Sequence, residues 1–447
     1  MADRRPLLLL AAVLAGWAVL LALILTHGVF VTNDSLSNYG HVWYVSERFW
    51  GGHGIPYHMP LLGHGEALAF PYAFLPWVTS AIVFPVLGDW AVTLWLVLGF
   101  LAMVGAMLWA LAELRKPTGV ALLLLCPMVV EAPLLGQLPF EWSTALLFVA
   151  IGLWRRERFM LAAVALGLAQ ATHAPLIMPL AGVIVALRFL FWEPNRVRLV
   201  AYYALSLVIA LPAVAMVFAS PVVDDTSLAV QMSNLIGTVL VRSPVVAWPF
   251  ALVWLLPRLK GSMPYALAGA LVLLNVLFVP VRQNDFGWEA LFRHPDTSVR
   301  PFIRADLFEK GKTYRILSSR DGKTPMYDLI RSGALLDSEF FPESINRRSF
   351  ADTSEYVGFL NKRRVDYVII YALYDKAHGT NEHALLDELT QKPADGVCAD
   401  RIAAVTEGEL EVLHVSPVRR APPDSVILTL RGGEPQYSVY RIKRSGC

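Results

Sequence analysis

Long apolar stretches, separated by short polar breaks, run along the chain to about residue 281. The first covers residues 7–25, about the length needed to cross a bilayer. It lacks a small-residue cleavage site, so we expect a retained anchor and not a secretory signal. Further candidate spans follow at residues 68–87, 90–112, 119–135, 143–153, 159–174, 176–190, 199–219, 245–256 and 265–279. The pattern predicts a polytopic α-helical membrane protein.

Basic residues fix the expected orientation of these spans. Arg4 and Arg5 precede the first span, so the positive-inside rule keeps the amino-terminus in the cytoplasm and sends the loop at residues 31–66 outside. The later basic residues expected inside are Arg115, Lys116, Arg155, Arg156, Arg158, Arg188, Arg196, Arg198, Arg258 and Lys260. This orientation places Gln137, His173 and everything after residue 281 outside the cytoplasm.

The number of candidate spans does not fit the expected orientation, and the difference is one crossing. Ten full spans that start inside would end inside, whereas the later basic clusters place the C-terminal third outside. The segments most open to miscounting are residues 68–112, which can hide a re-entrant helix, and residues 227–240, a mildly amphipathic run. We therefore expect nine to eleven transmembrane helices, with an odd number of true crossings.

From about residue 282 apolar and polar residues mix as they do in a water-soluble domain. Helices are expected at residues 325–336, 353–364 and 381–391, and strands at residues 313–317, 365–371, 410–415, 425–430 and 437–442. The chain thus divides into a transmembrane domain at residues 1–281 and an extracytoplasmic α/β domain at residues 282–447.

Composition narrows the class of protein. The 447 residues are 56% hydrophobic and 17% charged, which excludes an ordinary soluble protein, and the net charge of +2 predicts no nucleic-acid partner. Cys398 and Cys447 could pair if the polar third lies outside the cell, and two unpaired thiols are the equal alternative. Three cysteines make neither a metal cluster nor a disulfide framework.

Asp34 stands directly after the first span, at the start of the external loop. A carboxylate fixed at a helix end, yet exposed to a substrate from the lipid, suits a general base for a sugar hydroxyl. An N-cap of the helix expected at residues 36–50 is the competing interpretation. That helix is expected to lie along the membrane surface, because one face carries Tyr39, Val42, Trp43, Ser46, Phe49 and Trp50.

Several other polar residues are expected on the same side of the membrane. His53, His58 and His64 lack the spacing and partner of zinc ligands, so no metal site is predicted, although His58 and Glu66 are candidates for binding a phosphate or sugar. Gln137 and His173 each interrupt apolar runs, where polar residues indicate either a cavity or ordinary contact with water. Together with Asp34, these residues would line a pocket that faces outward.

A family resemblance rests on the order of these features: an N-terminal span, an acid directly after it in a large external loop, a Gly-x-Pro-Tyr turn and an aromatic, Pro-rich second span (Phe70-Pro71-Tyr72, Pro76-Trp77). The stretch from Gly136-Gln137 to His173-Ala174-Pro175 is similar to the Gly-Gln segment of bacterial polyprenyl-phosphate mannosyltransferase-like proteins. In this layout residues 1–280 resemble the GT-C superfamily of polytopic membrane glycosyltransferases.

The resemblance implies an inverting sugar transfer that needs neither metal nor cofactor. Asp34 would deprotonate the acceptor hydroxyl, and the polyprenyl phosphate of the donor would be the leaving group. Related enzymes often have a lysine where His173 stands, and Arg48 is the only Lys or Arg in the first loop. Arg242 and Arg282, both expected outside, are therefore candidates for binding the donor phosphate, with anchoring at lipid headgroups as the alternative.

The expected function is that of a plasma-membrane glycosyltransferase of the cell envelope, embedded in membrane lipids. It would move a sugar from a polyprenyl-phosphate donor to an extracytoplasmic glycan, lipid or protein acceptor. The dense polar run at residues 321–343 could bind an acceptor or a partner protein, or be simply solvated. The competing function is that of a non-catalytic polytopic scaffold or partner subunit of an envelope complex.

Overall fold

A computed structural model describes residues 4–30, 32, 35–61, 66–67, 74–218, 228–282, 291, 309–317, 327, 330–337, 349–371, 374–406, 435–445 and 447. The chain forms two compact units. The first consists of Met1–His58, Ala67–Ser220 and Thr226–Phe292, and the second of Met59–Glu66, Pro221–Asp225 and Arg293–Cys447. Each unit is described by itself.

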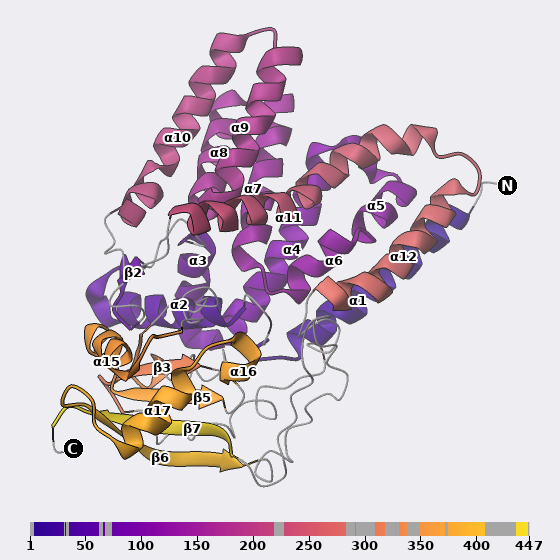
Figure 1. Cartoon of the computed structure of the whole chain (residues 1–447). Helices are drawn as coiled ribbons and strands as arrows, with labels where there is room; N and C mark the ends of the chain where they lie inside the picture. Colours follow the sequence, from indigo (N-terminus) through magenta and orange to yellow (C-terminus); the bar gives the residue numbers. More distant parts are fainter. Residues whose placement is uncertain are drawn as a thin grey trace. The chain divides into compact units, whose positions relative to one another are not determined.

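The first unit is helical (Figure 1). Its α-helices are α1 (Arg5–Leu25), α2 (Ser35–Arg48), α3 (Phe74–Leu87), α4 (Trp90–Ala110), α5 (Pro117–Leu124), α6 (Pro127–Leu134), α7 (Leu138–Arg155), α8 (Phe159–Thr172), α9 (Ala174–Phe191), α10 (Arg196–Phe218), α11 (Leu228–Leu255) and α12 (Met263–Arg282). Short helical turns are η1 (Phe49–His53), η2 (Ala112–Arg115) and η3 (Leu256–Arg258). Two short strands, β1 (His58–Met59) and β2 (Glu66–Ala67), pair with each other.

Several of these helices have the length and composition of membrane spans. Among the described residues, α1, α4, α9 and α10 pass both criteria, and α5 with α6 would add a fifth span if the bent pair is one crossing. Helices α3, α8 and part of α12 are apolar but shorter. The chain is a multi-pass membrane protein, which confirms the predicted fold class, whereas nine to eleven crossings remain a prediction.

The span expected at residues 119–135 is broken in two. Helices α5 and α6 are bent by 55° about Leu125 and Cys126, because Pro127 lacks an N–H group and forces the residue before it into an extended conformation. The carbonyl groups freed at residues 122, 124 and 125 accept hydrogen bonds from three other helices: Trp248 (3.3 Å), Trp17 (3.1 Å) and Asn275 (2.8 Å). The break is thus satisfied inside the protein, as a membrane interior requires.

The two segments expected at residues 227–240 and 245–256 belong to a single helix. Helix α11 runs unbroken from Leu228 to Leu255 and contains Pro244 and Pro249. The separation of residues 227–240 from the span expected at residues 245–256 was therefore wrong. Prolines are tolerated within membrane helices where neighbouring groups satisfy the freed backbone, so the polar residues before Pro244 did not mark an end.

Glycines allow the closest approaches between helices of the first unit. A methyl group at Gly152 of α7 would lie 2.2 Å from a ring carbon of Trp109 in α4, and one at Gly99 of α4 would lie 2.7 Å from the indole nitrogen of Trp142 in α7. At Gly167 of α8, it would lie 2.6 Å from the side chain of Ile209 in α10. The crossings between α4 and α7 and between α8 and α10 therefore require glycine.

The second unit contains a mixed five-stranded sheet in the order β4-β3-β5-β7-β6. Its strands and helices are β3 (Thr313–Leu317), β4 (Leu335–Leu336), α15 (Thr353–Lys362), β5 (Tyr367–Tyr371), α16 (Tyr374–His378), α17 (Glu382–Gln391), β6 (Cys398–Thr406) and β7 (Pro435–Lys443). Strand β3 is parallel to β4 and β5, and β7 is antiparallel to β5 and β6. Helices α15 and α17 pack on the sheet through Leu360, Leu386 and Leu389.

Most of the predicted elements of this unit are confirmed. The exceptions are β6 and α16, which the sequence did not predict, and β4, which ends the segment expected as a helix at residues 325–336. Gly333, two residues before β4, has a φ of 80°. This left-handed backbone conformation is typical of the residue that ends a helix, so the helical part of the segment stops there. The strands expected at residues 410–415 and 425–430 lie outside the described residues.

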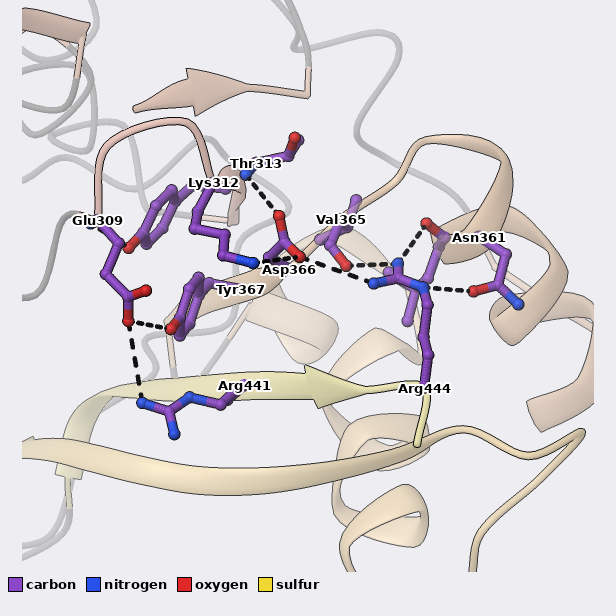
Figure 2. Close-up of polar contacts among 11 residues, drawn as sticks. Glu309, Lys312, Thr313, Asn361, Val365, Asp366, Tyr367, Arg441 and Arg444 are labelled. Atoms are coloured by element: carbon purple, nitrogen blue, oxygen red, sulfur yellow. Dashed lines mark hydrogen bonds and ion pairs between the residues drawn. The ribbon is translucent and has the colours of Figure 1, made fainter. Parts of the chain in front are cut away.

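A cluster of charged side chains closes the end of the sheet where β3 and β5 begin (Figure 2). Asp366 accepts a hydrogen bond from the Thr313 backbone N–H (3.0 Å) and lies 3.6 Å from Lys312 and 3.8 Å from Arg444. Arg444 in turn donates to the Val365 carbonyl oxygen at 2.7 Å. Ligands of parallel strands gather at their carboxyl ends, whereas this cluster lies at the amino ends, so we assign it to structure.

Arg315 of β3 is buried with two carboxylates. Its guanidinium donates to both oxygens of Glu382, at 2.6 and 2.8 Å, and to Asp337 at 2.9 Å. The three side chains are at most 1% exposed. Glu382 begins α17 and Asp337 follows β4, so this buried ion triad ties a helix and an edge strand to the middle of the sheet.

A disulfide joins Cys398, the first residue of β6, to Cys447. Its removal by Cys447→Ser is expected to lower the free energy of unfolding of the second unit by about 2–4 kcal/mol, because the crosslink restricts the unfolded chain. We would measure melting of the full-length protein with and without reductant. Reductant should lower the melting temperature of the wild type and of the control Cys126→Ala, and leave Cys447→Ser unchanged. A wild type insensitive to reductant would contradict the prediction.

Candidate active site

Helix α2, in the loop between α1 and α3, packs on the membrane helices through one apolar face. Tyr39, Val42 and Val45 on that face are at most 1% exposed. The Tyr39 hydroxyl accepts a hydrogen bond from the Phe30 backbone N–H (2.8 Å) and lies 2.6 Å from the Thr93 hydroxyl of α4. Tyr39 therefore fixes α2 against α4 and against the end of the first span.

The six residues expected on one face of this helix, along the membrane surface, lie on different sides. Tyr39, Val42 and Ser46 are buried inside the unit, whereas Phe49 is 36% and Trp50 58% exposed. The reason is the π-helical turn η1, whose wider period shifts these two aromatic residues to another side. The prediction that all six residues share one face of the helix was therefore wrong.

Asn38 links helix α2 to two other elements, and sequence analysis did not single it out. Its amide nitrogen donates to the Gly136 carbonyl oxygen (3.2 Å), and its amide oxygen accepts from the Trp77 indole of α3 (2.8 Å). The His41 ring stacks on Trp77 at 4.0 Å. Burial lowers the pKa of His41 to about 4, although the hydrogen bond to the Ser37 carbonyl acts in the opposite direction and raises it. The stacked ring is therefore neutral at pH 7. The sequence feature that could have identified Asn38 is its position as a polar residue on the apolar face of an amphipathic helix.

The Gly136-Gln137 turn joins α6 to α7. Gly136 has a φ of 68°, which favours glycine, and the Gln137 carbonyl accepts the N–H of Glu141 in the first turn of α7 (3.0 Å). Gln137 is only 3% exposed. Within the described part of the chain, its side-chain nitrogen has no hydrogen-bond partner. A buried amide of this kind can bind a polar ligand.

Further polar groups without hydrogen-bond partners lie near the start of α7 and the end of α8 in the described residues. Glu141 is fully buried, and a methyl group at Gly99 of α4 would lie 3.1 Å from its carboxylate. In the described residues, both Glu141 oxygens, the Thr144 hydroxyl and both amide atoms of Gln170 have no hydrogen-bond partner. Unsatisfied polar groups are costly in a membrane protein and by default indicate a functional interior. Sequence analysis did not single out Thr144 and Gln170, because each looks like an isolated polar residue in an apolar run.

His173 and Arg242 lie at this end of α7 as well. The Arg242 guanidinium is 5.9 Å from the centre of the Phe140 ring, and its charge acts on His173. His173 interrupts the chain between α8 and α9 with a φ of −150° and a ψ of 68°, and it is buried. Four elements thus meet at this end of α7. Asn38 of α2 binds the Gly136 turn before α7, Arg242 of α11 lies near Phe140 of α7, and its charge acts on His173 between α8 and α9.

The remaining predicted residues are placed differently. Arg48 ends α2, about 20 Å along the helix from Ser35, where its charge acts on Tyr44. His58 is half-buried and packs on the Tyr57 ring at 4.4 Å. Glu66 lies in β2 and Arg282 ends α12, but their side chains are outside the described part. Asp34 lies outside the described residues.

The described residues contain no group of three or more His, Cys, Asp or Glu side chains that could hold a metal ion. The candidate site therefore consists of hydrogen-bonding groups, one imidazole and one guanidinium. Such a set can bind a phosphate and a polyol, and its chemistry would be proton transfer and charge stabilisation.

Comparisons with known proteins concern the fold. No protein-family model matches the chain, and no curated protein sequence matches it. Among solved structures, the chain is similar to the arabinofuranosyltransferase AftD from Mycobacteria, with a TM-score of 0.52 and 15% sequence identity. The chain has a GT-C-like fold. The match covers 98% of this chain and 40% of that protein, so this chain spans less than half of its relative.

Proposed function

We propose that the protein is a membrane glycosyltransferase that takes a sugar from a polyprenyl-phosphate donor. The observation that carries the proposal is the meeting of Gln137, His173 and Arg242 at one end of α7 in a chain with a GT-C-like fold. Polar atoms without partners on Gln137, Glu141 and Gln170 are available to hydrogen-bond sugar hydroxyls. Arg242 would bind the donor phosphate, since a guanidinium matches phosphate oxygens in geometry and charge.

The proposed reaction is an inverting transfer. Asp34 takes the proton of the acceptor hydroxyl, and the acceptor oxygen attacks the anomeric carbon from the face opposite the phosphate. The bond between that carbon and the phosphate oxygen breaks, and polyprenyl phosphate leaves with the electron pair. No step calls for a metal or a cofactor.

An extracytoplasmic location of the reaction is supported by two features. By the positive-inside rule, the Arg and Lys residues at one set of span ends favour a cytoplasmic position for those ends, which supports an extracytoplasmic position for Gln137 and His173. The disulfide between Cys398 and Cys447 is typical of oxidising compartments outside the cytoplasm.

The test is sugar transfer by purified full-length protein from a panel of radiolabelled polyprenyl-phosphate pentoses and hexoses. Arg242→Gln is expected to raise the KM for the donor about 10- to 100-fold, the loss of one charged hydrogen bond. Arg258→Gln is the matched control, because this arginine also lies over an aromatic ring, 3.9 Å from Trp254, but in the turn η3 that follows α11, whereas Arg242 is in the middle of that helix.

Absence of transfer from every donor by folded wild-type protein would contradict the proposed function and favour a non-catalytic scaffold. Equal KM values for the two arginine variants would remove Arg242 from the donor site and leave the enzyme in place.

A further inference from the structure

A cavity of about 650 Å³ lies between α7, α8, α9, α10 and α11. Aliphatic and aromatic side chains make up nearly all of its wall, among them Ile151, Trp154, Leu166, Ile184, Tyr202 and Phe250. Figure 1 shows α8, α9 and α10 side by side along this part of the unit. Its volume is within the range of about 300–1,000 Å³ that is typical of ligand pockets.

The cavity extends from the middle of α7 and α11, where Ser243 follows Arg242, to the last residues of α7 and α9 and the first residues of α10. Its two ends therefore differ. Arg188 lies at the end of the cavity formed by the last residues of α7, 5.8 Å from the ring of Trp154, whereas Arg242 lies near Phe140 in the first turn of α7. Phe140 and Trp154 are 14 residues apart on one helix, about 21 Å, so a phosphate bound at Arg242 cannot also lie at Arg188.

Positive charge collects beside the cavity, at the turn between α9 and α10. Arg188 lines the cavity and donates to Glu193 at 2.8 Å, and Arg198 donates to the same carboxylate at 3.4 Å. Arg196 lies 5.1 Å from the ring of Phe189. Two arginines thus pair with one carboxylate and a third lies in the same turn, and both arginines that pair with Glu193 are more than a third exposed.

Arg198 retains hydrogen-bonding capacity. Within the described residues, its Nε has no hydrogen-bond partner, while its guanidinium lies 4.0 Å from the Phe159 ring. Exposed aromatic residues adjoin this turn, with Trp192 68% exposed. An apolar cavity, an excess of positive charge at its mouth and an interfacial tryptophan are the features that complement an anionic lipid.

We propose that this cavity holds an acyl chain of an anionic membrane phospholipid, whose phosphate lies against Arg188 and Arg198. The apolar wall favours the chain, because each buried methylene group gains free energy on leaving water. The arginines favour an anionic over a zwitterionic headgroup. The phosphate position at Arg188 and Arg198 differs from the proposed donor-phosphate position at Arg242, and the proposal does not depend on sugar transfer.

The test is lipid retention, measured by native mass spectrometry of full-length protein from nanodiscs that contain equal amounts of phosphatidylglycerol and phosphatidylcholine. Wild-type protein is expected to retain phosphatidylglycerol. Arg198→Gln should lower its retention at least about tenfold, the effect of one charge-assisted hydrogen bond, while Arg258→Gln leaves it unchanged. Equal retention of both lipids by the wild type, or of neither, would overturn the proposal.

A second pair of variants tests the cavity itself. Val183 lines the cavity, whereas Leu190 lies on the same helix and is similarly exposed (57% and 59%) without lining it. Val183→Trp should lower phosphatidylglycerol retention by filling the cavity, and Leu190→Trp should not. Equal effects of the two substitutions would overturn the acyl-chain site, and polyprenyl phosphate displacing phosphatidylglycerol from the wild type would overturn the phospholipid assignment.

Discussion

Replacement of Asp34 by Asn is expected to slow sugar transfer about 100- to 10,000-fold, the usual contribution of a general base. Asparagine has nearly the same shape and can still cap a helix, but it cannot take a proton from the acceptor hydroxyl. The loss should appear in kcat, since the proposed role concerns proton transfer and not donor binding. The measurement is the rate of transfer by purified protein under saturating donor.

Glu47→Gln is the matched control for this experiment. Glu47 is an exposed acid in the last turn of α2, in the same loop between α1 and α3, so its loss of charge should leave the rate unchanged. Melting temperatures of both variants should match that of the wild type. A fully active Asp34→Asn protein would refute the role of Asp34 as the base and favour the N-cap interpretation.

Replacement of Arg315 by Met is expected to lower the free energy of unfolding of the second unit by about 3–5 kcal/mol. The substitution leaves the carboxylates of Glu382 and Asp337 buried and without their cation. Removing one partner of a buried ion pair costs far more than the pair itself contributes. Pulse proteolysis of the full-length protein in urea, followed through fragments of residues 293–447, measures this free energy.

Two further proteins distinguish buried charge from general disturbance of the sheet. Arg441→Met removes an arginine of β7 whose side chain is 46% exposed and lies 4.0 Å from Glu309, so its effect should stay below about 1 kcal/mol. The triple variant Arg315→Met, Glu382→Leu, Asp337→Leu should recover much of the lost stability. Similar losses for Arg315→Met and Arg441→Met would contradict the explanation.

The positions of the membrane helices could be predicted because each is a continuous apolar run. What the sequence did not show was where such a run breaks: Pro127 divides one run, whereas Pro244 and Pro249 leave α11 intact. Where the run breaks, side chains of other helices reach the freed carbonyl groups, as Trp17 and Asn275 do. That information lies in tertiary packing and not in local sequence.

Parts of the candidate site could also be predicted, and others could not. Gln137 and His173 were noticed because they interrupt apolar runs, and both lie at the same end of α7 as Arg242. Asn38 was missed because its partners, Gly136 and Trp77, are 98 and 39 residues away in sequence. Strand β6 was missed since its segment mixes charged residues with alanines and forms an outer strand of the sheet, paired with β7.

The glycine crossings between α4 and α7 and between α8 and α10 limit how the membrane unit can move. Their side-chain atoms already leave no room for a methyl group, so these pairs have no space in which to tilt toward each other. These two crossings are therefore rigid parts of the first unit. Glycines of α9 and α11 are less confined, since a methyl group at Gly182 would come no closer than 3.5 Å to another atom and one at Gly237 would meet nothing within 4 Å. Opening of the unit to a substrate from the bilayer, which the proposed transfer would require, is therefore expected at α9 and α11.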